Sequence, residues 1–312
     1  MTTIVLAGGA GMVGQNLVPL LRAAGHRVLV IDKHAENLAL LGRLNPGVEA
    51  HLADLAVEGS WMGCLEGAAA VVDIKAQIAA PRPEIYHRNN VESQRLILEA
   101  CRKASIPHLV HVSSSVVISV AHDAYSETKR HAERLVFDSG VPFTTLRPSL
   151  MFGCFDVKHL GFIWGLLRLT PVLPIPGSGR YLRQPLFVMD LCRVILACLE
   201  REPSRRAHNV IGHERIDFID LIRAMPRARG ERRVIVPTPL PLFAALLGGY
   251  GWLTRRPTFV KEQLDALIAG DDFPVEPWSE EFGVPYTPFA EALREMLASP
   301  CFAAGAEMAS AH

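Results

Sequence analysis

Short apolar runs recur along the first half of the chain, and each is followed by a turn and a longer segment with helical spacing. Runs of this length, rich in Val, Ile and Leu, are typical of strands buried on both faces of a parallel sheet. The predicted strands are Ile4 to Ala7, Val28 to Ile31, Ala70 to Ile74, Leu109 to Val112 and Phe143 to Leu146. The predicted helices are Met12 to Ala24, His34 to Leu44, Glu84 to Ala104 and Ser126 to Ser139. Because such helices join parallel neighbours, the pattern predicts an α/β fold with a doubly wound parallel sheet.

The pattern loosens after Pro148, and prolines and glycines cluster from Pro171 to Gly179. We expect residues 1–150 to form a Rossmann-like domain, and residues 151–300 to form a smaller, mainly helical domain that covers it and holds the substrate. Within the second half, residues 184–212, with the helical Asp190 to Glu200, are expected to return to the main sheet. The small and polar residues 301–312 are expected to form a flexible tail.

Glycines recur at every third position after the first predicted strand, at Gly8, Gly11 and Gly14. This GxxGxxG spacing between the first strand and the first helix is a variant of the dinucleotide-binding fingerprint. Gly8 permits the tight turn, Gly11 lets a pyrophosphate approach the backbone, and Gly14 lets the helix pack closely. Met12 and Val13 open that helix, whose free N–H groups would receive the phosphates. The segment predicts a bound nucleotide cofactor, with a purely structural glycine turn as the alternative.

A carboxylate closes the second predicted strand at Asp32, 18 residues beyond the last glycine. It can accept both hydroxyls of the adenosine ribose, and it repels the 2′-phosphate of NADP. The sequence therefore predicts NAD as the cofactor, although Lys33 and His34 could soften the repulsion. Asp54 and Leu55 follow a third strand and are expected to reach the adenine edge. A helix N-cap is the alternative for Asp54.

Tyr125 and Lys129 lie four residues apart at the start of a predicted helix, so both project from one face. A tyrosine with a reference pKa of about 10 is a poor base at neutral pH, and a nearby ammonium group lowers that pKa by stabilising the phenolate. Tyr125 can then exchange a proton with a substrate hydroxyl while a hydride moves to or from a nicotinamide. The pair follows Ser113 to Ser115 at a strand end, where open α/β sheets bind their ligands.

Five segments carry a family resemblance: GGAGMVG at Gly8–Gly14, NNVESQRLILEAC at Asn89–Cys101, HVSSS at His111–Ser115, YSETK at Tyr125–Lys129 and LRPSLMFG at Leu146–Gly153. Over about residues 1–225 the chain resembles the extended short-chain dehydrogenases/reductases, which include NAD-dependent epimerases, dehydratases and 3β-hydroxysteroid-dehydrogenase-like proteins. The resemblance implies that Ser115, or alternatively Ser114, orients the substrate oxygen. It also implies that Lys129 holds the nicotinamide ribose and that Pro148 and Ser149 lie beside the nicotinamide.

The chain departs from the family pattern at two places. Ala7 replaces the threonine that usually precedes the first glycine, and only nine residues separate Ser115 from Tyr125. This connection is much shorter than in sugar-nucleotide epimerases, whose loop helps to build the sugar pocket. Arg183 resembles the arginine that contacts the nucleotide diphosphate in those enzymes, and a structural surface arginine is the alternative. Residues Phe282–Leu293 resemble the branch that contains an accessory subunit of respiratory complex I, whose members can bind a nucleotide without known turnover.

Composition removes several other classes of function. Lys plus Arg and Asp plus Glu are equal at 32 each, so no net positive field attracts a nucleic acid. The six cysteines form no CxxC pair and no cluster with zinc-ligand spacing, which predicts free, buried thiols and no metal. The chain enters a strand-like run at Ile4 without a charged leader, so we expect a cytoplasmic protein. By family analogy, the helices Glu84 to Ala104 and Ser126 to Ser139 could pair in a homodimer.

Two apolar segments of the second half bear on the substrate. They are His159 to Val172 and Leu240 to Leu253, with aromatic residues at Phe162, Trp164, Phe243, Tyr250 and Trp252. Prolines and glycines interrupt the uncharged stretch Val234 to Leu253, which predicts a buried or interfacial helix and not a membrane span. We expect these segments to cover the nicotinamide end, as an apolar pocket or a peripheral membrane contact. An ordinary core for the small domain is the alternative.

The sequence leaves three functions open. The first is an NAD-dependent oxidoreductase that acts on a secondary alcohol or ketone, with an apolar or lipid-like small molecule as the expected substrate. The second is a sugar-nucleotide epimerase or dehydratase, in which the same hydride is removed and returned. The third is a non-catalytic NAD(H)-binding scaffold or assembly factor, which would bind the nucleotide without turnover.

Overall fold

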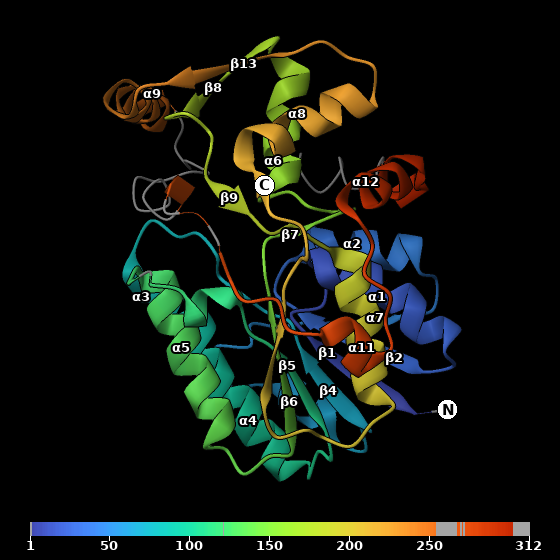
Figure 1. Ribbon diagram of the computed structural model, residues 1–312. Coiled ribbons are helices and arrows are strands. Elements are labelled where there is room, and N and C mark those ends of the chain that lie inside the picture. Colours follow the sequence, from blue (N-terminus) through green and yellow to red (C-terminus); the bar gives the residue numbers. More distant parts are fainter. Residues whose placement is uncertain (1, 121, 254–266, 269, 271, 302–312) are drawn as a thin grey trace.

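The centre of the protein is a seven-stranded sheet in which every neighbouring pair is parallel, in the order β11-β6-β5-β4-β1-β2-β3 (Figure 1). The computed structural model describes residues 2–120, 122–253, 267–268, 270 and 272–301. The strands are β1 (Thr3–Ala7), β2 (Arg27–Asp32), β3 (Glu49–Leu52), β4 (Ala70–Asp73), β5 (Leu109–Val112), β6 (Phe143–Pro148) and β11 (Ala207–Val210). The predicted Rossmann-like, doubly wound parallel sheet is confirmed.

Helices cover both faces of this sheet, which explains why β1, β2 and β4 are mainly apolar, whereas the edge strand β3 is largely exposed. Ile4 and Leu6 of β1 belong to the hydrophobic cluster under α1 (Met12–Ala23), α2 (Ala35–Leu44) and α7 (Val188–Leu199). Val5 and Ala7 belong to the cluster under α4 (Ser93–Lys103), α5 (Ala124–Phe137) and the 3₁₀ turn Ser60–Leu65. Successive side chains of a strand point to opposite faces, so both sets must be apolar.

Two of the predicted helices have different bounds in the structure. The predicted helix Glu84 to Ala104 consists of a short α3 (Pro83–Tyr86), a π-helical segment at His87–Glu92 and α4. Its start is set by Pro83, whose missing N–H is tolerated in the first turn of a helix. The predicted helix Ser126 to Ser139 begins earlier, as α5, because the Asp123 carboxylate accepts the Ser126 N–H at 2.8 Å and caps it.

A second layer of elements, here called the cap, lies over the carboxyl edge of the sheet (Figure 1). It comprises α6 (Leu160–Leu169), β8 (Val172–Pro176), β9 (Leu182–Arg183), β12 (Ile216–Asp217), α8 (Phe218–Ala228), β13 (Val234–Thr238) and α9 (Leu240–Leu253). β13 pairs with β8 in parallel, and β12 pairs with β9 antiparallel. Two short strands, β7 (Met151–Phe152) and β10 (Leu186–Phe187), lead into and out of the cap, and α11 (Trp278–Phe282) and α12 (Phe289–Ala298) end the described chain.

The cap and the sheet share one hydrophobic core. The cluster that contains Ile4 and Leu17 continues through Phe152 and Phe187 to Leu173 and Phe218 in the cap. Within the described residues, no helix is long and apolar enough to cross a membrane. The stretch Val234 to Leu253, for which a single buried or interfacial helix was expected, forms β13 and then α9. Apart from Cys301, the expected flexible tail lies outside the described residues.

We expect Gly14→Ala to lower the free energy of unfolding by about 1–3 kcal/mol, the usual cost of forcing extra atoms into a packed site. An added Cβ would lie 1.9 Å from the carbonyl oxygen of Gly9. The matched control is Gly42→Ala in α2, where an added Cβ would meet nothing within 4 Å. The control should leave stability unchanged or slightly raised, because alanine is the better helix former. Urea denaturation of both variants measures this, and a Gly14→Ala variant as stable as wild type would contradict the packing described here.

Candidate active site

The predicted site residues lie along one edge of the sheet, because parallel strands end on the same side. From one end to the other, this edge carries Pro148 and Ser149 at β6, Ser114 and Ser115 after β5, Gly8 after β1, Asp32 at the end of β2 and Asp54 after β3. The winding of the sheet reverses between β1 and β4, and open α/β sheets bind ligands at this switch point.

The glycine segment forms a tight loop between β1 and α1. Gly8 has φ +77°, a left-handed conformation that favours glycine, and its N–H donates to the Ile31 carbonyl at 2.8 Å. Gly14 approaches the Gly9 carbonyl so closely that no side chain fits between them. The surroundings of Gly11 differ, because a Cβ added there would meet nothing within 4 Å. These three positions match the roles of turn, close packing and open approach that a dinucleotide requires.

The start of α1 fits the pyrophosphate of NAD. Gly11 is the N-cap residue and brings no side-chain hydrogen bond to the first turn, which opens with Met12 and Val13. The first N–H groups of a helix have no partner inside the helix, and together with the helix dipole they favour an anion. When NAD is bound, it supplies a nicotinamide carbon that gives or takes a hydride.

Asp32 is buried at the end of β2, and its carboxylate is firmly held. One oxygen accepts the Ala10 N–H at 3.0 Å, and the other accepts the His34 N–H at 3.0 Å and lies 2.9 Å from the His34 ring. Burial works to raise the pKa of Asp32, but the hydrogen bonds from His34 and Ala10 outweigh it and hold the pKa below its ordinary value. The side chain is therefore a fixed negative charge beside the glycine loop, and carboxylate oxygens keep spare lone pairs for ribose hydroxyls.

Asp54 stabilises a turn and does not cap a helix. One of its oxygens accepts the Ala56 N–H at 3.0 Å, and the other is 2.7 Å from the Arg88 guanidinium. Burial acts to raise the pKa of this carboxyl, but the hydrogen bonds from Ala56 and Arg88 outweigh burial and hold the pKa below its ordinary value. The carboxyl therefore stays ionised at neutral pH. Leu55 points into the core with 7% exposure. A contact of Asp54 with adenine remains a prediction.

Tyr125 lies in the first turn of α5, and its hydroxyl is hydrogen-bonded to Ser114. Burial raises the pKa of Tyr125 to about 12, although the bond to Ser114 works in the opposite direction. The expected lowering of the Tyr125 pKa is therefore wrong for this structure, in which burial decides the direction of the net shift. Lys129 is 1% exposed, and its Nζ donates to the Val112 carbonyl at the end of β5 at 3.1 Å. Ser115 is buried beside them, at the start of a short 3₁₀ turn.

The short connection between Ser115 and Tyr125 is held by one arginine. The guanidinium of Arg130 donates to the carbonyls of Val116, Val117 and Ser119. The loop is thus fastened to α5.

Ser149 and Arg183 have structural contacts of their own. The Ser149 hydroxyl donates to the Gln184 carbonyl at 2.6 Å and accepts the Gly212 N–H at 3.0 Å, which ties β6 to the chain that returns from the cap. Arg183 is 4% exposed and therefore does not lie on the surface. Its guanidinium donates to the Leu267 carbonyl and lies over the Tyr181 ring. Roles for Pro148, Ser149 and Arg183 towards a ligand remain predictions.

Three charged or titratable residues near Lys129 were not foreseen from the sequence. Asp73, at the end of β4, is 3.5 Å from the Lys75 ammonium and 2.9 Å from the ring of His111 in β5. The signal that could have found them is a carboxylate and an ammonium within the apolar run Ala70 to Lys75.

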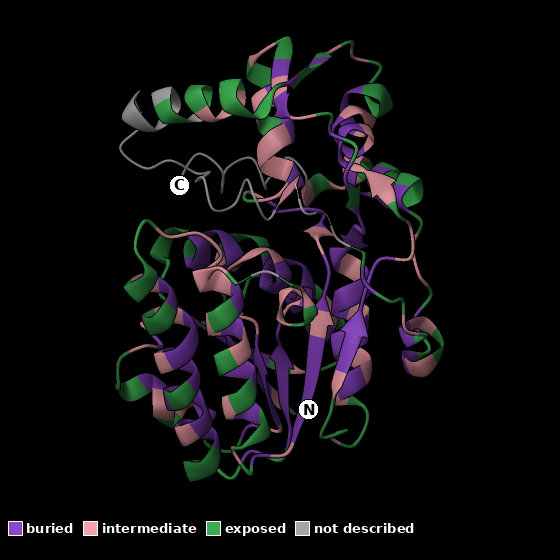
Figure 2. Ribbon diagram, turned by 60° about the vertical axis from the view of Figure 1, so that its left-hand side comes forward, coloured by how far each residue is buried: buried purple, intermediate pink, exposed green. Residues whose placement is uncertain are grey.

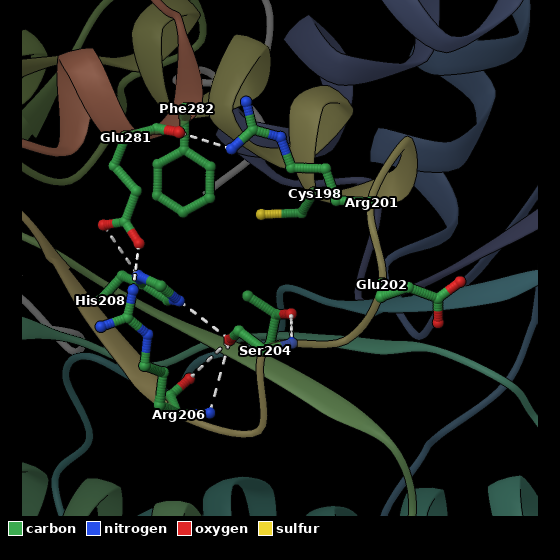
Figure 3. A pocket seen from close by; sticks show the side chains of 9 residues that line it. Cys198, Arg201, Glu202, Ser204, Arg206, His208, Glu281 and Phe282 are labelled. Carbon is green, nitrogen blue, oxygen red and sulfur yellow. Dashed lines mark hydrogen bonds and ion pairs between the residues drawn. The ribbon is translucent and has the colours of Figure 1, made fainter.

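A polar hollow at the opposite edge of the sheet does not compete with this site (Figure 3). Figure 3 shows the Glu281 carboxylate facing Arg206 and His208, and both side chains pair with it. These two pairs and the bond from Arg201 to the Glu281 carbonyl tie α11 to the start of β11 and to the end of α7, so the contacts of the hollow are accounted for by the fold. The described residues hold no group of side chains suited to a metal ion, and all six cysteines are free.

Comparison with known proteins agrees with the geometry of the sheet edge. The family model described as the NAD dependent epimerase/dehydratase family matches residues 4–212. The chain belongs to this family. Its resemblance to the extended short-chain dehydrogenases/reductases is thereby confirmed, and so are its oxidoreductase class and NAD as the family's cofactor.

Curated relatives are similar at low identity. A 4-hydroxy-2-methyl-3-oxo-4-farnesyl-3,4-dihydroquinoline-1-oxide ketoreductase of Stigmatella aurantiaca is 27% identical over 82% of each chain. A decarboxylating sterol-4-alpha-carboxylate 3-dehydrogenase of Mus musculus is 28% identical over 59% of this chain and 55% of its own length. A subunit of mitochondrial NADH dehydrogenase, alpha subcomplex subunit 9 of Arabidopsis thaliana, is 25% identical over 81% of this chain and 64% of its own length.

Solved structures share the fold. The epimerase Mth375 of Methanothermobacter thermautotrophicus aligns with a TM-score of 0.80 at 19% identity, over 99% of this chain and 94% of that one. MoeE5, solved with UDP-glucuronic acid and NAD, aligns with a TM-score of 0.72 at 21% identity, over 94% of this chain and 96% of that one.

We expect the protein to bind NADH at least about tenfold more tightly than NADPH, because Asp32 places a fixed negative charge where the 2′-phosphate would lie. Calorimetric titration with both nucleotides measures the ratio. Asp32→Ala should narrow the ratio, whereas Glu49→Ala, which removes an acid at the start of β3, should not. Equal or tighter binding of NADPH by the wild type would show that Lys33 and His34 dominate instead.

Proposed function

We propose that the protein is an NAD-dependent oxidoreductase that interconverts a secondary alcohol and a ketone, with Tyr125 as the acid and base. The observation that carries this proposal is the grouping of Tyr125, Ser114, Ser115 and Lys129 where β5 ends and α5 begins, on the edge that carries the glycine loop. A proton donor, a hydroxyl and an ammonium group in one place are what carbonyl reduction beside a nicotinamide requires.

Each residue has a separate task in ketone reduction. Tyr125 would give its phenolic proton to the carbonyl oxygen while the carbonyl carbon receives the hydride that bound NADH would supply, which would leave NAD⁺, the alcohol and a Tyr125 phenolate. Ser115, or Ser114 in its place, donates a hydrogen bond that orients the substrate oxygen. The Lys129 ammonium offsets the phenolate charge and holds the nicotinamide ribose. Because the pKa of Tyr125 is raised to about 12, its phenol carries a proton at neutral pH, which suits a donor.

An apolar ketone is the favoured substrate class. The relative with the widest coverage quoted above is named for a farnesyl-bearing dihydroquinoline, and another is named for a sterol carboxylate. The short loop after Ser115, fastened by Arg130, leaves out the segment that would form a sugar pocket.

The outer face of the cap supports a peripheral contact with a membrane, from which such a substrate could enter. Leu169 is 85% exposed, Val234 is 58% exposed, and Leu242 and Leu246 of α9 are about half exposed. Figure 2 colours much of α9 as exposed. The 30 residues from Arg232 to Lys261 contain no Asp or Glu, and their charged residues are Arg232, Arg233, Arg255, Arg256 and Lys261, of which Arg233 pairs with Glu231. Exposed apolar side chains flanked by cations are suited to an anionic lipid surface. The side chains of Tyr250 and Trp252, singled out in the sequence, lie outside the described residues.

Two other functions are separated from this one by specific results. A sugar-nucleotide epimerase is favoured by the fold shared with MoeE5, and it would keep NAD bound through turnover. A non-catalytic nucleotide-binding scaffold is favoured by the similarity to a subunit of mitochondrial NADH dehydrogenase, and it would bind NADH without consuming it.

Tyr125→Phe should lower turnover by about 100-fold or more, the usual effect of losing a positioned proton donor. It should leave NADH affinity and thermal stability near wild type, because the ring stays in place. Tyr286→Phe is the matched control. Tyr286, in the C-terminal part of the chain, donates its hydroxyl proton to Glu214, and its replacement should not affect turnover. Wild-type turnover in Tyr125→Phe would remove the catalytic assignment.

The substrate class is tested by comparing NADH oxidation with a steroid ketone, a long-chain ketone and a UDP-sugar, with flotation on vesicles alongside. We expect turnover with the apolar ketones, and binding to vesicles that contain an anionic lipid but not to neutral ones. Leu242→Ser with Leu246→Ser should reduce flotation, whereas Leu52→Ser, at an exposed leucine of β3, should not. Activity confined to nucleotide sugars, without vesicle binding, would favour the epimerase.

A further inference from the structure

A second lysine lies in the interior next to Lys129. Lys75 follows β4, and its backbone lies against the glycine loop, since a Cβ on Gly8 would be 2.7 Å from the Lys75 Cα. Its side chain is 10% exposed, and its Nζ donates to the Gln94 amide oxygen of α4 at 2.9 Å. Burying an ammonium group costs several kcal/mol unless partners compensate it, so its place in the fold calls for an explanation.

The register of the sheet links Lys75 to Lys129 through Asp73. Asp73 of β4 is opposite His111 of β5, and its carboxylate accepts the His111 ring N–H at 2.9 Å while lying 3.5 Å from the Lys75 ammonium. The Lys129 ammonium donates a hydrogen bond to the carbonyl of Val112, the residue that follows His111. Asp73 and Lys129 are both at most 1% exposed, so their charges interact with little screening by water.

The charges of this group do not cancel. Burial lowers the pKa of His111, so its ring is neutral at pH 7. Burial acts to raise the pKa of Asp73, but the charges and hydrogen bonds of Lys75 and His111 hold it far below its ordinary value. Glu133 of α5, the other carboxylate that faces Lys129, is paired with Arg147 of β6. One unshared carboxylate therefore lies beside two buried lysines, and burial lowers the pKa of Lys75 as well, while the charge and hydrogen bond of Asp73 act to raise it.

Three polar atoms of the group have no hydrogen-bond partner among the residues that the structure describes: Oδ1 of Asp73, Nε2 of His111 and Nε2 of Gln94. Each of these atoms keeps hydrogen-bonding capacity for a water molecule.

We propose that Lys75 is a positioning residue of the candidate site: its ammonium, anchored by Asp73 and Gln94, repels the Lys129 ammonium and loosens the hold of Lys129 on its proton. The direction of the pKa of Lys129 agrees, because burial and the charge of Lys75 lower it to about 8, against the pull of Asp73 and Glu133. A lysine with this pKa changes charge between about pH 7 and pH 9.

The consequence for catalysis rests on the proposed function. If Lys129 must be an ammonium to offset the Tyr125 phenolate and to hold the ribose, turnover falls as the pH rises through about 8. Removing Lys75 removes the repulsion, so the alkaline limb of the pH profile moves to higher pH. A purely structural role for Lys75 would lower stability or turnover at every pH and would leave the limb in place.

Lysine-selective ¹³C labelling and NMR test the proposal without substrate or NADH, so the result is independent of turnover. The chain has few lysines to assign, namely Lys33, Lys75, Lys103, Lys129, Lys158 and Lys261. We expect the Cε signal of Lys129 to titrate near pH 8 in the wild type and about 1 unit or more higher in Lys75→Met. Lys75→Arg, which keeps the charge, should restore the wild-type midpoint, and the exposed Lys103→Met should not change it.

An unchanged Lys129 midpoint in a folded Lys75→Met would overturn the proposal. Should Lys75→Met fail to fold, Lys129→Met asks the same question, because coupling between two sites is reciprocal. The Lys75 signal should then titrate at higher pH than in the wild type, and an unchanged Lys75 midpoint would overturn the proposal equally.

Discussion

The parallel pairing of β1 with β2 on one side and β4 on the other is the constraint on which the rest of the structure depends. It brings the ends of all seven strands to one edge, so residues from Gly8 to Ser149 lie along one line despite their separation in sequence. It also leaves both faces of the sheet to be covered by helices, which places α1 on one face and α5 on the other. The topology of the sheet thus determines which residues of the candidate site lie close together.

Burial sets the electrostatics of that edge. Asp32 keeps its charge because backbone and ring N–H groups replace water, and Tyr125 keeps its proton because little replaces water at its oxygen except Ser114. The pKa of Lys129 lies between these two extremes, because its ammonium has one hydrogen bond to a carbonyl and the charge of Lys75 acts on it. The same low-dielectric interior therefore fixes one group as an anion, one as a proton donor and one near its titration point.

The sequence predicted the fold and the edge of the sheet at which the candidate site residues gather, because both depend on local signals. Apolar runs of four or five residues marked the strands, and the spacing of Gly8, Gly11 and Gly14 marked the loop that the structure forms. The early start of α5 was missed because it depends on the cap at Asp123, which precedes the helical pattern. The π-helical segment before α4 leaves no periodic signal.

Interactions that depend on register could not be predicted from the sequence. Asp73 meets His111 only because β4 and β5 pair in one particular alignment, and Ser149 meets Gly212 only because the chain returns from the cap beside β6. The direction of the pKa of Tyr125 was wrong for a related reason, since spacing gives the distance to Lys129 along the helix but not the degree of burial. Ligand roles for Asp54 and Arg183 depend on contacts outside the chain, which sequence and fold leave as predictions.

The central claim, net hydride transfer at this edge of the sheet, is tested most directly with NADH deuterated at the transferring position of the nicotinamide. The protein is incubated with an apolar ketone, and the alcohol is analysed by mass spectrometry. The account predicts one deuterium on the carbinol carbon for each NADH consumed. NADH that binds without any deuterium reaching a ketone, or NAD that stays bound while a nucleotide sugar is epimerised, would contradict it.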